Sequence, residues 1–424
     1  MKFILFLIFL IISVLGVQAD TMWDMKELSK APKVYSWNEP VYGENSWAYN
    51  MYLTEEEREY DKTNDSIRGI YYKGVDYQGK ETKVFAYIGV PKHQKGTKVP
   101  GMVLVHGGGG SAFEAWVRKW NAMGYAAISM DTTGNGPTNE MTGKPTGFGG
   151  PGNVFAFDAP VKDQWPYQAV ADVILAHSLL ASIEDVDKNN IGITGVSWGG
   201  YLTCIASSVD SRFKFAIPVY GTGFLYDYSP TVQRDEDTLN KWIPLWDPSI
   251  YLKNTKVPIT WLVSNVDWCY WLLGVKRSYD VVPIKDKNIC IFNKWTHGHY
   301  ETAGRGEPLA IANYYVNKNY KNNKKQTMPK VLEAVYKDNY LTFTVNVNTD
   351  SVVLYWTDDE NPKGHSSGDP NQGTKWNSVP VPFNNNKGSV EIPLEAKVFY
   401  INAVSKEGLE SSSEIYVKQL GIKQ

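Results

Sequence analysis

The stretch IGITGVSWGGYLTCIAS, residues 191–207, joins an apolar run to a segment with helical spacing through a turn that contains a serine. Residues 195–199 match G-x-S-x-G, a pattern that is typical of a nucleophile elbow when it lies between a strand and a helix. The flanking glycines let strand and helix approach without a Cβ, and the helix N-terminus favours a developing negative charge. We therefore predict that Ser197 is a nucleophile, with a structural turn as the alternative.

The chain around this turn alternates short apolar runs with helical segments from Val99 to about Trp295. Near-continuous apolar strands that alternate with helices predict a parallel sheet covered on both faces. Upstream, residues 67–91 hold two alternating segments around a glycine-containing turn, which predicts an antiparallel hairpin at the edge of that sheet. The expected strands lie in 100–108, 125–131, 190–197, 214–221, 258–267 and 287–295, and the expected helices in 113–124, 163–183 (long and amphipathic) and 199–209.

The character of the chain changes after about Asn317. Residues 317–329, NKNYKNNKKQTMP, are polar and basic and read as a linker. Beyond them, short segments alternate with period two between Asn, Asp, Gly and Pro turns, which predicts a small β-sandwich of immunoglobulin-like architecture. The Cys…Trp…Cys pattern of true immunoglobulin domains is absent. We expect a catalytic domain over residues 20–320 and a β-sandwich over residues 328–424.

The N-terminus has the pattern of a secretory signal peptide. Lys2 precedes an apolar run of about 14 residues, shorter than the ~20 that span a bilayer, and VQA at 17–19 offers small residues for cleavage. We predict a signal peptide over residues 1–19, with an uncleaved anchor as the alternative. The mature chain is then secreted or delivered to an endomembrane lumen and has no membrane span. Its 3 cysteines allow at most one disulfide.

The composition excludes some classes of partner and cofactor. The formal net charge is −2 over 424 residues, without the clustered basic excess that nucleic-acid binding needs. The cysteines and histidines form no CxxC pair or mixed cluster of the kind that holds zinc. We therefore expect no nucleic-acid partner, no metal and no organic cofactor.

A nucleophilic serine needs an acid that orients its base, and after an elbow of this kind the chain order is serine, acid, histidine. Asp267 ends the apolar run at 258–267, so it follows a late strand and lies where the acid is needed. Asp237 and Asp247 are the alternatives, but they fall in a segment that follows no strand. We predict that Asp267 is the acid.

The histidines that follow Asp267 are His297, His299 and His365. His365 falls in a turn of the expected β-sandwich, so we discount it. His297 lies closer to the end of the last strand and precedes a glycine, which favours it as the base. His299 is then a pocket or surface residue, although the sequence leaves the choice between the two open.

A glycine run, residues 107–110, follows the early strand and its His106. Such a loop turns backbone N–H groups towards the point above the sheet where the serine lies. We predict oxyanion donors at Gly108 and Gly109, together with the N–H of Trp198 after the nucleophile. The loop lacks the Gly-Lys-Ser/Thr of a phosphate loop, and His106 precedes the serine, so we expect it to be structural.

Together, residues 103–131, 192–221, 264–271 and 293–299 resemble secreted α/β-hydrolases of the acetyl xylan esterase, dienelactone hydrolase and prolyl-oligopeptidase-like group. The resemblance covers about residues 99–310 and implies a serine carboxylesterase acting on a small-molecule or glycan ester. Acetyl esters of a polysaccharide are one such substrate. A Gly/Pro-rich insertion after Asp131 departs from the group and should lie at the carboxyl ends of the strands, with Trp165 and Phe157 as candidate pocket walls.

Two other functions stay open from the sequence. One is a serine exopeptidase or acyl-peptide hydrolase, since a doubled glycine after the serine occurs in both classes of this group. The segment before the sheet is too short for the β-propeller of the oligopeptidases, whose blades need about 40 residues each, which favours an esterase. The other is a non-catalytic binding or adhesion protein on a hydrolase fold, and the β-sandwich itself either binds a partner or caps the catalytic domain.

Overall fold

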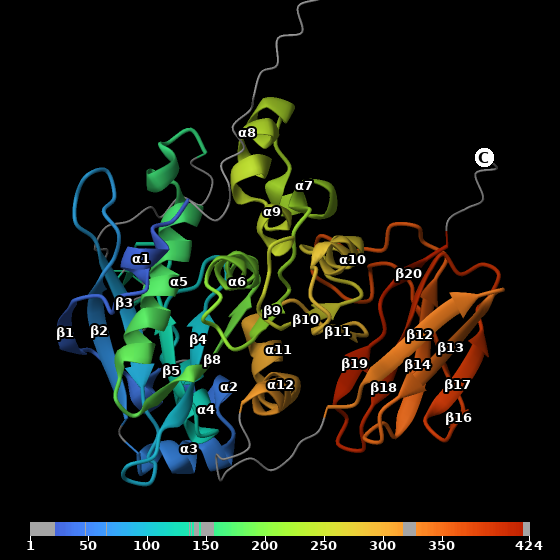
Figure 1. Ribbon diagram of the computed structural model, residues 1–424, viewed down its shortest axis with the longest axis horizontal. Coiled ribbons are helices and arrows are strands. Elements are labelled where there is room, and N and C mark those ends of the chain that lie inside the picture. Colours follow the sequence, from blue (N-terminus) through green and yellow to red (C-terminus); the bar gives the residue numbers. More distant parts are fainter. Residues whose placement is uncertain are drawn as a thin grey trace, which may run out of the picture.

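A computed structural model describes residues 22–46, 48–64, 66–134, 136, 138–139, 144–145, 157–316 and 328–418. The predicted signal peptide and most of the predicted linker lie outside the described residues. Figure 1 shows a central sheet with helices packed on it and an all-β region beside its far edge.

Six strands of the central sheet run parallel in the order β5-β4-β8-β9-β10-β11. All residues of β4, β5 and β10 are buried. Because alternate side chains of a strand point to opposite faces, both faces of the sheet are covered. The predicted parallel sheet is confirmed. The strands are β4 (Val99–Val105), β5 (Ala126–Met130), β8 (Val186–Val196), β9 (Ala216–Val219), β10 (Ile259–Ser264) and β11 (Lys287–Phe292).

An antiparallel segment extends the sheet beyond β5. β2 (Ile67–Lys73) and β3 (Lys83–Gly89) form the predicted hairpin, and β3 pairs antiparallel with β5. β1 (Val34–Glu39) adds a further antiparallel strand at the edge.

The helices follow the strands as expected, with one difference. α5 (Trp165–Ser182) is buried from Trp165 to Leu180, whereas the sequence predicts an amphipathic helix. The reason is the N-terminal segment, which covers the outer side of α5: Trp23 Nε1 donates to Tyr167 O (3.0 Å) and Ser178 Oγ donates to Leu28 O (2.6 Å). The other helices are α1 (Met25–Leu28), α2 (Tyr49–Tyr52), α3 (Glu55–Lys62), α4 (Glu114–Ala122), α6 (Trp198–Val209), α7 (Leu225–Tyr228), α8 (Glu236–Trp246), α9 (Ser249–Leu252), α10 (Leu272–Val281), α11 (His299–Ala303) and α12 (Glu307–Tyr315).

The C-terminal region consists of two sheets around a second apolar core. The immunoglobulin-like label stays a prediction, but the all-β character is confirmed. One sheet has the order β12-β13-β17-β16, and the other contains β19, β18, β14 and β15, with β20 paired to β18. Their bounds are β12 (Val331–Lys337), β13 (Tyr340–Val345), β14 (Ser351–Thr357), β15 (Asn377–Pro380), β16 (Phe383–Asn384), β17 (Lys387–Glu391), β18 (Val398–Val404), β19 (Glu410–Ser412) and β20 (Tyr416–Val417).

The sandwich is joined to the central sheet, which the sequence does not predict. β19 pairs antiparallel with β11 at Ile289 and Ser412, so a single sheet of 14 strands runs from β1 into the sandwich. β18 is buried on both faces: Val398 and Tyr400 belong to the main core, while Phe399 and Ile401 belong to the sandwich core. The sandwich is therefore packed against the α/β part of the chain and is not tethered to it by a linker alone.

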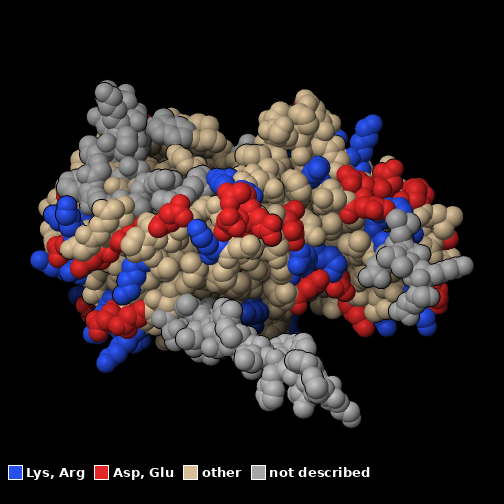
Figure 2. Space-filling view, turned by 90° about the horizontal axis from the view of Figure 1, so that it is seen from above, with Lys and Arg blue, Asp and Glu red and all other residues tan. Residues whose placement is uncertain are grey.

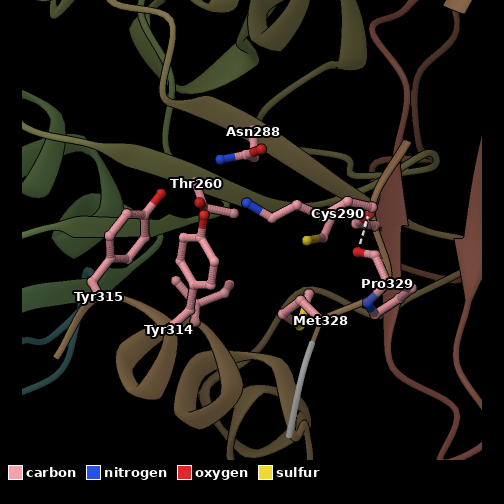
Figure 3. A pocket seen from close by; sticks show the side chains of 10 residues that line it. Thr260, Asn288, Cys290, Tyr314, Tyr315, Met328 and Pro329 are labelled. Atoms are coloured by element: carbon pink, nitrogen blue, oxygen red, sulfur yellow. Dashed lines mark hydrogen bonds between the residues drawn. The ribbon is translucent and has the colours of Figure 1, made fainter. Parts of the chain in front are cut away.

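A small pocket lies at the seam between the two parts (Figure 3). Thr260 and Cys290 come from β10 and β11, Tyr314 from α12, and Met328 from the start of the sandwich segment. At the same pocket, Ser411 Oγ donates a hydrogen bond to Pro329 O (2.7 Å). Cys290, like the other cysteines, is buried and free of any disulfide in the described chain.

Acidic and basic side chains are interspersed over the face shown in Figure 2. This distribution agrees with the formal net charge of −2 and places no continuous basic stripe on that face. Over the described ranges, no helix combines the length and the apolar character that a bilayer crossing requires.

Candidate active site

Ser197 lies at a strained turn between β8 and α6. Its backbone has φ 59° and ψ −119°, an unfavourable region for a residue with a side chain. Such a conformation costs about 1–3 kcal/mol and persists only where the surroundings impose it. Here the Ser197 N–H donates to Val219 O (2.9 Å) and the Ser197 carbonyl accepts from the Tyr201 N–H (2.9 Å). The observed turn has the geometry of the predicted elbow.

The glycines around the serine are required by close backbone approach. A Cβ on Gly199 would collide with the carbonyl oxygen of Val105 at the end of β4. A Cβ on Gly195 would collide with the carbonyl of Gly199 itself. The G-x-S-x-G pattern thus lets α6 begin directly against the ends of β8 and β4.

Asp267 and His297 form a hydrogen-bonded pair. Asp267 is buried, follows β10 closely, and its Oδ2 accepts from His297 Nδ1 (2.8 Å). Its Oδ1 accepts from the N–H groups of Cys269 (2.7 Å) and Tyr270 (2.8 Å). Because a carboxylate only accepts, the imidazole proton lies on Nδ1, and Nε2 is left as a lone-pair site. The side chain of His297 is 11% exposed, which leaves it accessible from one side.

Tyr220 connects this pair to the elbow. Tyr220 directly follows β9, the strand that binds the Ser197 N–H, and its ring centroid lies 4.6 Å from that of His297. Tyr220 Oη donates to Thr296 O (2.7 Å) and so holds the residue before the histidine. The Tyr270 ring is parallel to the ring of His297, with centroids 6.1 Å apart and planes at 3° to each other. Neither tyrosine is predicted as a site residue from the sequence, because no local pattern marks them.

Within the described ranges, the hydrogen bond of His297 is to Asp267, and none links it to the serine hydroxyl. Among the described residues, no hydrogen bond is formed by Ser197 Oγ. Catalytic hydrogen bonds are often long in unliganded enzymes and tighten in the complex with substrate. The structure therefore brings Asp267 and His297 together. Ser197 lies at the same end of the sheet, after β8, with β9 between β8 and the β10 strand that precedes Asp267.

His299, the other candidate base, is engaged elsewhere. Its Nε2 accepts from the Gly107 N–H (3.0 Å), and its ring packs against Phe113 and Trp116 at the start of α4. Burial, aided by His106 and His297, lowers the pKa of His299 to about 3. The ring is thus neutral, with its proton on the buried Nδ1, which has no partner among the described residues.

The alternative acids and the discounted histidine have other partners. Asp247 is buried and accepts from the N–H groups of Phe224 (2.8 Å) and Leu225 (2.9 Å), a structural role at the start of α7. Asp237 lies exposed in the first turn of α8. His365 is exposed and is bonded through Nδ1 to Ser367 Oγ (2.8 Å).

The glycine loop after β4 reaches the elbow. A Cβ on Gly107 would lie 3.2 Å from Ser197 Cβ, and a Cβ on Gly108 would lie 2.6 Å from Trp198 Cδ1. Gly109, with φ 72°, faces open space. Trp198 is the first residue of α6, where N–H groups point out of the helix end. Gly107 therefore lies next to Ser197 and Gly108 next to the Trp198 ring, whereas a Cβ on Gly109 would have no neighbour within 4 Å.

His106 has the structural role that the sequence predicts. It is buried, its Nδ1 donates to Gly107 O (2.8 Å), and its Nε2 accepts from the Thr132 N–H (3.0 Å). The ring thereby ties the glycine loop to the segment after β5.

The two candidate pocket walls lie in different surroundings. Trp165 is buried, donates from Nε1 to Thr132 O (2.7 Å), and meets the Trp198 ring edge-on with centroids 5.6 Å apart. Trp165 therefore packs against Trp198, the residue after the serine. Phe157 is partly buried against Trp242 of α8. The remaining part of the insertion is largely outside the described residues.

Comparison with known proteins relates this arrangement to one family. A family model described as acetyl xylan esterase (AXE1) matches residues 25–249, more than half of the 424 residues. The match includes Ser197 and ends before Asp267 and His297. In a curated relative, the hydrolase LUC6 of Fusarium sp., 228 residues align at 23% identity. They make up 50% of this chain and 49% of that protein, so the chain spans about half the length of the relative.

The solved structures that are similar to this chain include two acetyl xylan esterases. The one from Paenibacillus sp. R4 has a TM-score of 0.53 at 19% identity and covers 71% of this chain and 95% of its own. The one from Thermoanaerobacterium sp. JW/SL YS485 has a TM-score of 0.46 at 17% identity, with 66% and 98% covered. Identities of this size show the fold alone, and the family is shown by the extent of the model match. The chain therefore belongs to the acetyl xylan esterase family.

Proposed function

We propose that this chain is a serine carboxylesterase that removes acetyl or other short acyl groups from carbohydrate or small-molecule esters. The observation that carries the proposal is the pair formed by Asp267 and His297 at 2.8 Å. It lies at the same end of the sheet as a serine that is held at φ 59° in a strand-to-helix turn. A strained serine at the same end of the sheet as a histidine held by a buried carboxylate is the arrangement of a nucleophile that is activated by a general base.

In the proposed reaction, His297 Nε2 takes the proton of Ser197 Oγ while Oγ attacks the acyl carbonyl. Asp267 keeps the other imidazole proton on Nδ1 and stabilises the imidazolium that forms. The imidazolium then gives its proton to the leaving alcohol, and the acyl group stays on Ser197 as an ester. Water attacks this ester with His297 again as base, which releases the carboxylic acid and restores the serine.

The negative charge on the tetrahedral intermediate needs donors that are in place beforehand. We assign the N–H groups of Trp198 and Gly108 to this role, with Gly109 as a second donor from the glycine loop. Each such donor typically contributes about 3 kcal/mol to the transition state. The N-terminal end of α6 adds a favourable dipole at the same place.

We further propose that the protein is exported through the signal peptide at residues 1–19. Edman sequencing of the chain recovered from the medium of expressing cells is then expected to begin at Asp20. A chain that keeps Met1 or stays with the membrane fraction would contradict this.

The test of the esterase proposal is hydrolysis of p-nitrophenyl acetate, acetylated xylo-oligosaccharides and peptide anilides by the mature chain. We expect turnover of the acetyl esters and a loss of several powers of ten in Ser197→Ala. Ser207→Ala is the matched control, since Ser207 lies in the same helix and its Oγ bonds only to Thr203 O (2.7 Å). Preference for the anilides would indicate a peptidase. If neither the wild type nor Ser197→Ala hydrolyses any of these substrates, a binding protein would be the better explanation.

A further inference from the structure

The loop between β14 and β15, residues 358–376, lies against the loop that carries Asp267. We call these the bracing loop and the acid loop (residues 265–271). The Gly364 N–H of the bracing loop donates to Asp267 O (2.9 Å). A Cβ on Gly364 would collide with Val266 O and would lie 2.6 Å from Trp268 N. The sandwich thus touches the backbone of the proposed catalytic acid itself.

A second contact of the sandwich passes through Asn265. Trp376 Nε1, at the end of the bracing loop, donates to Asn265 O (3.1 Å). Asn265 Nδ2 donates to Tyr400 Oη on β18 (3.1 Å). The asparagine is buried and lies next to the end of β10, so two elements of the sandwich hold the start of the acid loop.

The same asparagine also holds the segment that leads to His297, residues 293–298, which we call the base loop. Asn265 Nδ2 donates to Asn293 Oδ1 (3.0 Å), and Asn265 Oδ1 accepts from the Lys294 N–H (2.9 Å). Lys294 has φ 54°, a conformation that this bond helps to hold. The side chain of Lys294 also reaches the bracing loop, where Nζ donates to Asn371 Oδ1 (3.2 Å).

Both loops of the acid–base pair are therefore fastened to each other and to the sandwich. Parallel strands end side by side but do not set the conformations of the loops that follow them. A carboxylate and an imidazole on two separate loops lose their hydrogen bond if either loop shifts by about 1 Å, and such a misplacement can cost ~100-fold in rate. The satisfied donors and acceptors of Asn265 remove this freedom.

We propose that the C-terminal sandwich is a positioning element of the active site, which sets the Asp267–His297 distance through Gly364, Trp376 and Asn265. The expected change in kcat rests on the proposed function. The expected change in the Asp267–His297 geometry does not, because it can be measured without substrate. The sandwich then acts as a part of the hydrolase and not as an appended binding module.

The test uses the full-length mature chain with Gly364→Ala, Trp376→Phe and Gly388→Ala. Gly388 lies on β17, where a Cβ would collide with the Phe343 ring in the sandwich core, away from the acid loop. It is the matched control, because it adds the same methyl group to the same domain. We expect Gly364→Ala to lower kcat by about 10- to 100-fold at similar KM and to shift the acid limb of the pH–rate profile. We expect Trp376→Phe to have a smaller effect and Gly388→Ala to lower only the melting temperature.

Nitrogen-15 NMR of labelled histidines gives a readout that is independent of turnover. The His297 Nδ1–H, assigned with His297→Gln, reports the bond to Asp267. The Nδ1–H of His177, which is bonded to Asp210 Oδ2 (2.8 Å) inside the protein, is an internal reference. We expect Gly364→Ala to move or broaden the first signal and leave the second unchanged. An unchanged His297 signal and kcat in Gly364→Ala, or equal losses in Gly388→Ala, would overturn the positioning role. A wild type that hydrolyses no ester would instead overturn the esterase proposal, while the NMR result would still decide the positioning.

Discussion

Replacing Asp267 by asparagine is expected to impose the wrong tautomer on His297. In the wild type, Oδ1 accepts from the N–H groups of Cys269 (2.7 Å) and Tyr270 (2.8 Å). An asparagine must direct its carbonyl oxygen at these two donors, since its amide group has no acceptor to offer there. The amide N–H₂ then faces His297 Nδ1, which becomes an acceptor and carries no proton. The ring proton moves to Nε2, which can no longer take the proton of Ser197.

The expected loss in kcat for Asp267→Asn is about 10⁴-fold, the size seen when a triad acid is replaced by its amide. This corresponds to about 5 kcal/mol of transition-state stabilisation. The assay is steady-state hydrolysis of p-nitrophenyl acetate at pH 6–9, with melting temperatures to verify folding. Asp267→Ala serves as the comparison: it leaves the imidazole free to adopt either tautomer, so we expect it to be no less active than Asp267→Asn. An asparagine variant that keeps a tenth of the wild-type rate would refute the assignment of Asp267 as the acid.

Three further predictions concern the surroundings of the serine. His299→Leu leaves the Gly107 N–H unpaired and should cost about 1–3 kcal/mol of stability with a lower kcat, whereas His299→Gln, which offers an acceptor, should lose less; urea melts and kinetics on both variants check this. Burial lowers the pKa of His299 from 6.5 to about 3 in the folded chain. Between these pH values the unfolded chain binds a proton at His299 that the folded chain does not bind. The free energy of unfolding should therefore fall as the pH drops from about 6.5 towards 3. Urea melts over this range should show a weaker decline in His299→Gln, and an equal decline would contradict the buried neutral ring. Gly199→Ala should yield little soluble protein or a melting temperature well below that of wild type, because its Cβ would meet the carbonyl of Val105; a wild-type melting curve would speak against the close approach.

Much of the catalytic fold is predictable because its signals are local. Apolar runs that alternate with helical segments indicate a covered parallel sheet, and the strands β4, β5, β8, β9, β10 and β11 follow that pattern. The elbow is marked by Gly199 and Gly195, whose Cβ atoms would collide with the carbonyl groups of Val105 and Gly199 respectively. Asp267 and His297 could be proposed from their places after late strands, since the ends of parallel strands meet at one edge of a sheet.

Contacts between segments that are far apart in the chain have no local signal in the sequence. The choice between His297 and His299 needed the observation that the first is bonded to Asp267 and the second to Gly107. The long helix α5 looks amphipathic in isolation but is buried all round, because a segment about 150 residues earlier in the chain covers it. His365 was set aside as part of a sandwich turn, yet its neighbour Gly364 is bonded to the backbone of Asp267.

The sequence by itself determined the class of fold, and it predicted the serine elbow and the order of serine, acid and histidine. It could do so because strand and helix periods, glycine requirements and strand ends depend on residues close together in the chain. Only the tertiary structure decided that β19 continues the sheet from β11 and that Asn265 joins the two loops of the acid–base pair to the sandwich. The contacts with the sandwich pair residues more than 100 positions apart, as with Asn265 and Tyr400 at a separation of 135. Hydrogen bonds of this kind depend on how whole layers pack, and no local pattern encodes that.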